Sequence, residues 1–341
     1  CPGIPFPAEC ICYASNNPAF CDTLDMTCCW WPTEPEFGHN IYVMDKTVPM
    51  KMSNDNHEPG SKTMPDGTVI HFPNDGMAEI EAAIDWLFNH QNTAPFISYR
   101  LIQRLIKSNP SPAYVGRVAS AFANNGNGVR GDLKAVIKAI LLDEEARSAA
   151  GYLDEYAGKL REPMLRYTHL SRSMPTVTDQ GRYWNNGFEY LNDTRQHVMA
   201  SPTVFNFYTP DFQPVGDIAA AGLVAPEFKL HNTATAITYI NRNLAWTVGD
   251  FLMYSWLHTD EVPDAVHLRP ASIETLFYDT EDLINELDIL LTHGQLSDET
   301  RQILRNALGP LYSATDAEYQ FFRTRLAIHL IMTSPDYNCT K

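Results

Sequence analysis

The residues best suited to chemistry lie in one polar loop, residues 54–63, with the sequence NDNHEPGSKT. The loop places an imidazole, two carboxylates and an amine around a Pro-Gly turn, and such groups can exchange protons with a substrate. His57, Glu58 and Lys62 are therefore candidate catalytic residues, and Arg161, from a later segment, could join them by clamping an anionic group. The alternative is structural: these side chains bond to backbone groups and acids in a turn that links two parts of the protein.

The same region offers ligands for a divalent cation such as zinc or calcium. Asp55, His57 and His71 would supply oxygen and nitrogen atoms, and zinc enzymes often combine two histidines with one carboxylate. Their spacing does not match the His-Glu-x-x-His helix motif or the twelve-residue calcium loop. The metal hypothesis therefore rests on residue types and not on a recognised pattern.

Two common enzyme classes find no support in the sequence. Ser201 lacks the Gly-x-Ser-x-Gly turn of a serine hydrolase. The glycines of NNGNGVRGD (residues 124–132) end a predicted helix, and no Lys-Ser/Thr pair follows them, so they do not form a phosphate-binding loop.

Cysteine usage gives the best evidence for the compartment. Six of the seven cysteines lie in the first 29 residues, within an irregular segment, and none has the Cys-x-x-Cys spacing of a zinc knuckle. We therefore predict a disulfide-stapled segment over residues 1–44 and a linker over residues 45–76, with a small hairpin at the Pro-Asp-Gly turn. The odd count leaves one thiol free or paired with another chain. The cysteines are Cys1, Cys10, Cys12, Cys21, Cys28, Cys29 and Cys339.

Other features agree with a secreted or cell-surface protein. Asn192 and Asn338 begin Asn-x-Thr triplets, which are acceptor sites for glycans. The chain begins at Cys1, so we expect a processed or partial chain. It contains no run of about 18 apolar residues, and therefore no segment that would span a bilayer.

Composition narrows the function further. The 341 residues are 44% hydrophobic, enough for a sizeable core. With 25 basic and 41 acidic residues the net charge is −16, which argues against nucleic-acid binding because that requires a basic surface.

Apolar spacing predicts an all-α, bundle-like body over residues 77–341, with two possible modules at 77–150 and 160–341. The first helix carries a stripe of Met77, Ile80, Ile84, Leu87 and Phe88, and Asn74 or Asp75 can cap it. Further helices are predicted to begin near Thr93, Ser111, Asp132 and Pro163 and to cover 231–256, 281–292, 297–308 and 316–333.

Two groups of charges are predicted to join helices. Arg100 and Arg104 lie one turn apart and could share an acid such as Asp85 or Glu81, or form an anion site. In GKLREP (residues 158–163), Arg161 and its neighbours are predicted to form an internal ion pair or cap, while an anion clamp is the alternative.

Several segments, in order, resemble the domain of unknown function 1800 family of secreted bacterial proteins. The resemblance covers residues 45–340 and implies a mostly helical secreted protein, without implying a reaction. Members usually have a further helical half before the segment that matches the polar loop at residues 54–63, so this chain resembles their C-terminal half, with the Cys-rich segment in place of the rest. The matching segments are HEPGSKT, TAPFISYRLIQRLIKSNPSPAYVGRVASAF, GDLKAVIKAILLDEEAR, GKLREP, SPTVFNFYTPDFQP and LAIHLIMTSPDY.

These observations predict an extracellular surface, matrix or assembly component that acts through protein–protein contacts. Its partner would be another chain, a cleaved N-terminal half or a second copy, because an absent helical half would leave apolar surface uncovered. The alternative is a secreted metal-dependent or acid–base enzyme acting on a polymer such as a polysaccharide.

Overall fold

The computed structural model describes residues 57–71, 75–148, 153–154, 157–174, 176–177, 188–204, 206–250, 267–268, 279–311 and 317–340. The chain divides into two units, Cys1–Thr93 and Ala94–Lys341. The Cys-rich segment and Asp55 lie outside the described residues. No disulfide is found where the structure is described, in which Cys339 is the one cysteine, so the disulfide staple stays a prediction.

The described part of the first unit contains a hairpin and one helix. Strands β1 (Lys62–Thr63) and β2 (Val69–Ile70) pair antiparallel around the predicted turn, where Gly67 adopts a φ of 88° that favours glycine. Helix α1 (Gly76–Asn89) follows and is capped by the Asp75 side chain, as predicted. Trp86 Nε1 donates a hydrogen bond of 2.9 Å to Asp66 Oδ2, which ties the helix to the hairpin turn.

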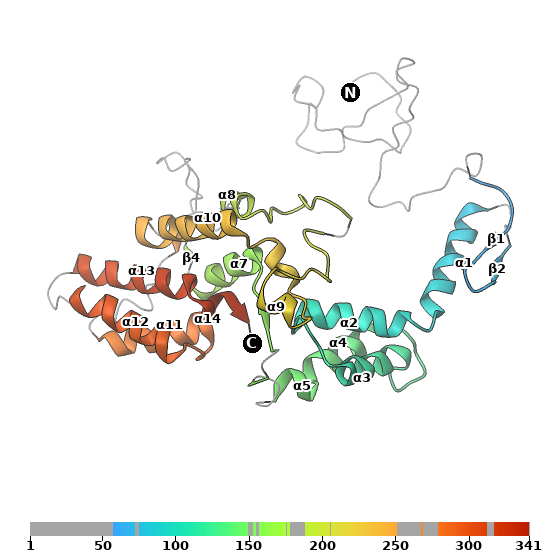
Figure 1. Cartoon of the computed structure of the whole chain (residues 1–341), viewed down its shortest axis with the longest axis horizontal. Coiled ribbons are helices and arrows are strands. Elements are labelled where there is room, and N and C mark those ends of the chain that lie inside the picture. Colours follow the sequence, from blue (N-terminus) through green and yellow to red (C-terminus); the bar gives the residue numbers. More distant parts are fainter. Residues whose placement is uncertain are drawn as a thin grey trace, which may run out of the picture. The chain divides into compact units, whose positions relative to one another are not determined.

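The second unit begins with a small helical group, α2 to α5. Helices α2 (Thr93–Leu105), α3 (Pro112–Ala123), α4 (Leu133–Leu142) and α5 (Glu144–Arg147) follow one another on short links (Figure 1). Ser111 caps α3 ahead of a proline that suits the first turn, and Asp132 caps α4, so both predicted starts are confirmed. The shared core consists of Ala94, Ile102, Tyr114, Val118, Phe122, Val136 and Ile140.

The rest of the second unit is a larger helical group that includes two short two-stranded sheets among its described residues. Its α-helices are α7 (Pro163–Ser173), α8 (Phe188–Asp193), α9 (Asp217–Ala220), α10 (Thr233–Leu244), α11 (Thr280–Thr292), α12 (Asp298–Leu308), α13 (Ala317–Thr333) and α14 (Pro335–Asn338). Two 3₁₀ turns lie at Pro226–Lys229 and Gly309–Leu311. Strand β3 (Lys159–Leu160) pairs antiparallel with β6 (Cys339–Thr340), and β4 (Thr176–Val177) with β5 (His267–Leu268).

The core of this group is formed mainly by α7, α10, α11, α12 and α13. Tyr239 Oη, from α10, donates to the Met332 carbonyl at 2.6 Å, so a long-range hydrogen bond joins two of these helices inside the core. The other buried members include Leu170, Tyr190, Leu283, Ile284, Leu287, Leu291, Leu304, Ala327, Ile328 and Ile331.

The mostly helical fold is confirmed, with one difference in the long helix predicted for residues 231–256. Helix α10 ends at Leu244, and Ala245–Asp250 continue as a wider π-helical turn. That turn brings Trp246 into the core, where its ring stacks on Tyr190 at 4.5 Å between centroids. Residues 251–256 lie outside the described part of the chain. Among the helices that the structure describes, none is long and apolar enough to cross a bilayer.

Candidate functional site

In the first unit, the predicted loop residues converge on a carboxylate from α1. The imidazole Nε2 of His57 contacts the Glu79 carboxylate, and Lys62 Nζ lies 3.2 Å from Glu79 Oε1. Lys62 also donates to the carbonyls of Glu58 and Gly60, at 2.5 and 3.0 Å. Sequence reasoning named His57 and Lys62 but missed Glu79, whose only signal was a lone acid in the first turn of an apolar helix.

The electrostatics of Glu79 favour a fixed negative charge. Burial alone would raise the pKa of its carboxyl, but hydrogen bonds from His57 and Lys62 and their charges outweigh this effect and lower that pKa. An ionised carboxylate against an imidazole can orient a general base. The same contacts also clamp the loop to α1, and that structural role accounts for every bond observed.

The remaining loop candidates do not join this cluster. Glu58 has an exposed side chain and contributes its backbone carbonyl to Lys62. His71 is exposed, with its Nδ1 3.4 Å from Ser61 Oγ. The described residues hold no group of three His, Cys, Asp or Glu side chains that could bind a metal ion, and Asp55 lies outside them.

In the second unit, buried side chains of the GKLREP segment form ion pairs, as the structural interpretation predicted. Lys159 Nζ lies 2.8 Å from Glu227 Oε1, and both side chains are almost fully buried. The Glu162 carboxylate accepts hydrogen bonds from Arg104 and from Gln196. Within the second unit, the acid that pairs with Arg104 is therefore Glu162, 58 residues further along the chain. A pair with Asp85 or Glu81 would join the two units and stays a prediction.

Within the second unit, Arg100 forms no ion pair with a described acid, although its charge helps to lower the pKa of Asp211. Its Nη1 donates to Gln103 Oε1 at 2.9 Å, and its guanidinium lies over the rings of Phe96 and Tyr99. Within the described residues of the second unit, Arg100 and Arg104 therefore share no ion pair with one acid, while their shared use of Asp85 or Glu81 in the first unit stays a prediction.

Arg161 is buried in different surroundings. Its Nη1 lies 2.6 Å from His169 Nδ1, and its guanidinium lies over the Tyr337 ring at 4.6 Å from the centroid. Burial lowers the pKa of His169 to about 4, assisted by the positive charge of Arg161 and by His293. A neutral His169 accepts from Arg161 at Nδ1 and donates from Nε2 to the Leu290 carbonyl, 3.2 Å away.

Arg161 also lines a pocket of about 560 Å³ within the second unit. Helix α2, the end of α5, strand β3 and helix α7 contribute to its wall. The lining residues are Arg104, Leu105, Ile106, Lys107, Glu145, Ala146, Arg147, Ser148, Ala157, Gly158, Lys159, Arg161, Leu165, Gln295 and Thr340.

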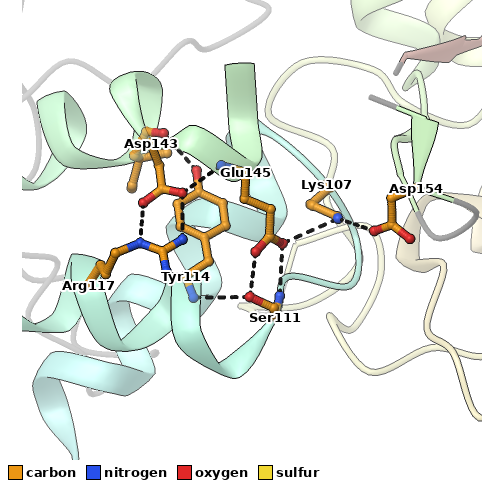
Figure 2. Close-up of polar contacts among 8 residues, drawn as sticks. Lys107, Ser111, Tyr114, Arg117, Asp143, Glu145 and Asp154 are labelled. Carbon is orange, nitrogen blue, oxygen red and sulfur yellow. Dashed lines mark hydrogen bonds and ion pairs between the residues drawn. The ribbon is translucent and has the colours of Figure 1, made fainter. Parts of the chain in front are cut away.

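One side of this pocket is fixed by a polar network that Figure 2 shows. Lys107 Nζ donates to Glu145 Oε1 at 3.3 Å and to Asp154 Oδ2 at 2.9 Å. Glu145 also accepts from the Ser111 backbone N at 3.0 Å and from its hydroxyl. The network thus ties the end of α2 and the start of α3 to α5.

Asp143 extends the same network toward α3. It accepts two hydrogen bonds of 2.8 Å from Arg117 and caps α5 through the Glu145 backbone N at 2.9 Å. The bonds from Arg117 hold the pKa of Asp143 below its usual value. These acidic neighbours therefore act as caps and ion-pair partners, as expected for acids at helix ends.

A family model described as a protein of unknown function, DUF1800, matches residues 38–339. The chain belongs to the DUF1800 family. The match includes the Glu79 cluster and all residues that line the pocket at Arg161 except Thr340, and it confirms the family that the sequence segments resemble. No curated protein and no solved structure matches the chain, so the DUF1800 assignment brings no reaction with it and the function must be argued from the residues.

The two predicted glycan sites differ in this DUF1800 chain. Asn192, in α8, is exposed and has room for a glycan. Asn338 is 9% exposed, and its Nδ2 donates to the Met332 and Ser334 carbonyls at 2.8 and 2.7 Å. A glycan on Asn338 would replace one of the two Nδ2 hydrogens and so break one of these bonds at a buried position, which makes Asn192 the better candidate of the two.

Proposed function

We propose that this protein is a secreted surface, matrix or assembly component that acts by binding another protein chain through helix α1. The observation that carries the proposal is the apolar stripe of this helix. Met77, Ile80, Ile84 and Leu87 recur at helical spacing and are all exposed, Ile84 by 56% and Leu87 by 55%. The buried residues of α1 are Gly76 and Glu79, neither of which belongs to the stripe.

An exposed stripe of this kind favours association. Each Å² of apolar surface removed from water contributes roughly 25 cal/mol, so a docked helix face gains several kcal/mol. Single chains seldom leave a continuous apolar patch in water. Recognition of an amphipathic helix by an apolar groove uses side chains at this spacing.

The charges around the stripe indicate the chemistry of the partner. Glu81 and Asp85 are exposed and border one side of it, and α1 contains no lysine or arginine. The whole chain has a net charge of −16, so a second copy would bring the same acids to the interface. The favoured partner is therefore a different protein, with an apolar face flanked by Lys or Arg.

The extracellular location is supported by the crowding of cysteines before residue 30 and by the exposed Asn192 side chain, which begins an Asn-x-Thr triplet. The resemblance adds that family members usually have another helical half in this part of the chain.

Site-specific photo-crosslinking tests the proposal. In one variant a benzophenone amino acid replaces Ile84, and in a control variant it replaces the exposed Gln302 of α12. Both variants are expressed in the cells that naturally produce the protein. We expect a crosslinked heteromeric species from position 84 but not from position 302, and its loss when Leu87→Asp is added. A crosslink to a second copy, or equal yields at both positions, would overturn the proposed partner.

One observation favours the enzyme alternative, namely the contact between the Glu79 carboxylate and the His57 imidazole. An acid–base enzyme acting on a polysaccharide would lose activity in His57→Gln without losing its fold. Release of reducing ends from a panel of extracellular polysaccharides measures this activity, and absence of release by the intact protein excludes this alternative for those polymers.

A further inference from the structure

The pocket at Arg161 carries an excess of positive charge within a protein of net charge −16. Five basic residues and one carboxylate, that of Glu145, line it. The basic residues are Arg104, Lys107, Arg147, Lys159 and Arg161.

Three of these cations are balanced by nearby acids. Arg104 pairs with Glu162, Lys107 with Glu145 and Asp154, and Lys159 with Glu227. These pairs account for the structural role of the three side chains.

The other two cations, Arg147 and Arg161, have no carboxylate partner among the described residues. Arg147 ends α5 and is exposed, whereas Arg161 is only 6% exposed. A buried guanidinium without a counter-charge is costly, so a site that keeps one is suited to an anion that completes it.

A second buried arginine strengthens the positive field behind the pocket. Arg166 is 1% exposed, its Nε donates to the Arg161 carbonyl at 2.7 Å, and its guanidinium lies over the Tyr239 ring. Its Nη2 has no hydrogen-bond partner, and no described carboxylate pairs with it. Arg161 and Arg166, which lie next to each other, therefore both carry positive charge beside the pocket without a carboxylate partner among the described residues.

The remaining lining narrows the class of anion. Leu105, Ile106 and Leu165 supply apolar surface, and no aromatic side chain is among the described residues that line the pocket. Sugars usually stack on aromatic rings, so the lining favours an aliphatic or small organic body over a saccharide. The volume of about 560 Å³ lies within the range of small-molecule sites.

We propose that this pocket binds a small organic acid, with its carboxylate held by Arg161 and Arg147 and its apolar body against Leu105, Ile106 and Leu165. A planar guanidinium can donate two parallel hydrogen bonds to the two oxygens of a carboxylate, so opposite charge and matching geometry both favour the pair. This binding site is separate from the α1 stripe and does not depend on the proposed function.

Calorimetric titration of the intact chain tests the site. The probes are hexanoate and phenylacetate, with hexanol and phenylacetamide as neutral counterparts and sulfate as an inorganic oxyanion. We expect at least one of the two carboxylates to bind saturably, and we expect its neutral counterpart not to bind. Arg147→Gln removes an exposed charge without a structural partner and should weaken binding about tenfold, since a hydrogen bond to a charged group has that order of effect.

Two further variants make the result decisive. Lys134→Gln removes an exposed charge outside the pocket and should leave the affinity unchanged, so a general charge effect is excluded. Arg161→Lys keeps the positive charge but removes the planar guanidinium with its two parallel N–H donors. This variant should weaken binding at least as much as Arg147→Gln. Absence of binding at about 10 mM, equal binding of sulfate and hexanoate, or affinities insensitive to Arg147→Gln would each overturn the proposal.

Discussion

Helices α1 and α11 have similar lengths and similar apolar spacing, but their surroundings differ completely. In α11, Leu283, Ile284, Leu287 and Leu291 are fully buried by the neighbouring helices. In α1 the corresponding stripe is exposed, and the one buried side chain beyond the first residue is Glu79. Apolar periodicity therefore identifies a helix and its apolar face. It does not identify what covers that face, because this depends on distant parts of the chain or on another molecule.

The ion pairs of the two units show the same contrast. Lys159 and Glu227 are both almost fully buried, whereas Lys62 leaves 34% of its side chain exposed beside Glu79. A buried pair needs each partner, because loss of one leaves an uncompensated charge, while an exposed group can turn to water. Substitutions in matched pairs can therefore test whether the two units differ as strongly in energy as in burial.

The largest effect is expected for the buried lysine. Lys159→Met leaves Glu227 without a counter-charge and removes two bonds to the carbonyls of Gln103 and Arg104. We expect a loss of about 4 kcal/mol in the free energy of unfolding, measured by urea denaturation. Lys62→Met should have a far smaller effect, because Glu79 keeps its contact with His57. Equal losses of unfolding free energy in Lys159→Met and Lys62→Met would contradict the expected difference between the buried and the exposed ion pair.

The next effect concerns the two apolar stripes. Leu287→Ala creates a cavity in a fully packed core and should cost about 3 kcal/mol of stability. Leu87→Ala removes a side chain that is already 55% exposed and should change the melting temperature little. A large loss from Leu87→Ala in the isolated chain would mean that its own residues cover α1, and would remove the main support for a partner there.

The sequence was informative where the determinants are local. The caps at Asp75, Ser111 and Asp132 and the hairpin turn follow from neighbouring residues, and the structure has all of them. Partners far along the chain could not be identified in this way. His57 was a candidate from its residue type, but Glu79, 22 positions later, becomes its partner only when the loop folds onto α1.

The same limit applies to the pocket. Arg161 was predicted as a possible anion clamp, since its segment combines two cations with an acid at a helix start. Which acid would pair with which cation depends on the packing of α2 against β3 and the 3₁₀ turn at Pro226–Lys229. In that packing, Arg104 pairs with Glu162 and Lys159 pairs with Glu227. Arg161 instead contacts the neutral His169.

His169 gives the second unit a pH dependence of known sign. The pKa of this residue is about 4 in the folded chain against 6.5 for an unperturbed histidine, so the unfolded chain binds more protons between these values. The stability is therefore complete above pH 6.5 and falls as the pH is lowered toward 4. After allowance for partial solvent screening the loss is about 2 kcal/mol.

His169→Gln isolates this contribution, because glutamine can still accept from Arg161 but does not titrate. Denaturation at a series of pH values from 7 to 4 should show a shallower loss of stability in the variant than in the original chain. Carboxylates titrate in the same range in both proteins, so only the difference between the two curves reports His169. Parallel curves would contradict the assignment of His169 as the neutral partner of Arg161.

The smallest effect compares two helix caps. Asn232 caps α10 through the backbone N atoms of Ala234 and Thr235, at 3.0 and 3.2 Å, and Asn232→Ala should lower the free energy of global unfolding by about 1 kcal/mol. Asp75→Ala removes the equivalent bond to Met77 in α1, at 3.0 Å. Because α1 buries so little of its surface, its loss should appear as faster hydrogen exchange in residues 76–89 without a shift of the global transition. A global shift as large as that of Asn232→Ala would show that α1 and the second unit unfold together, and that the exposed stripe belongs to a helix the rest of the chain already stabilises.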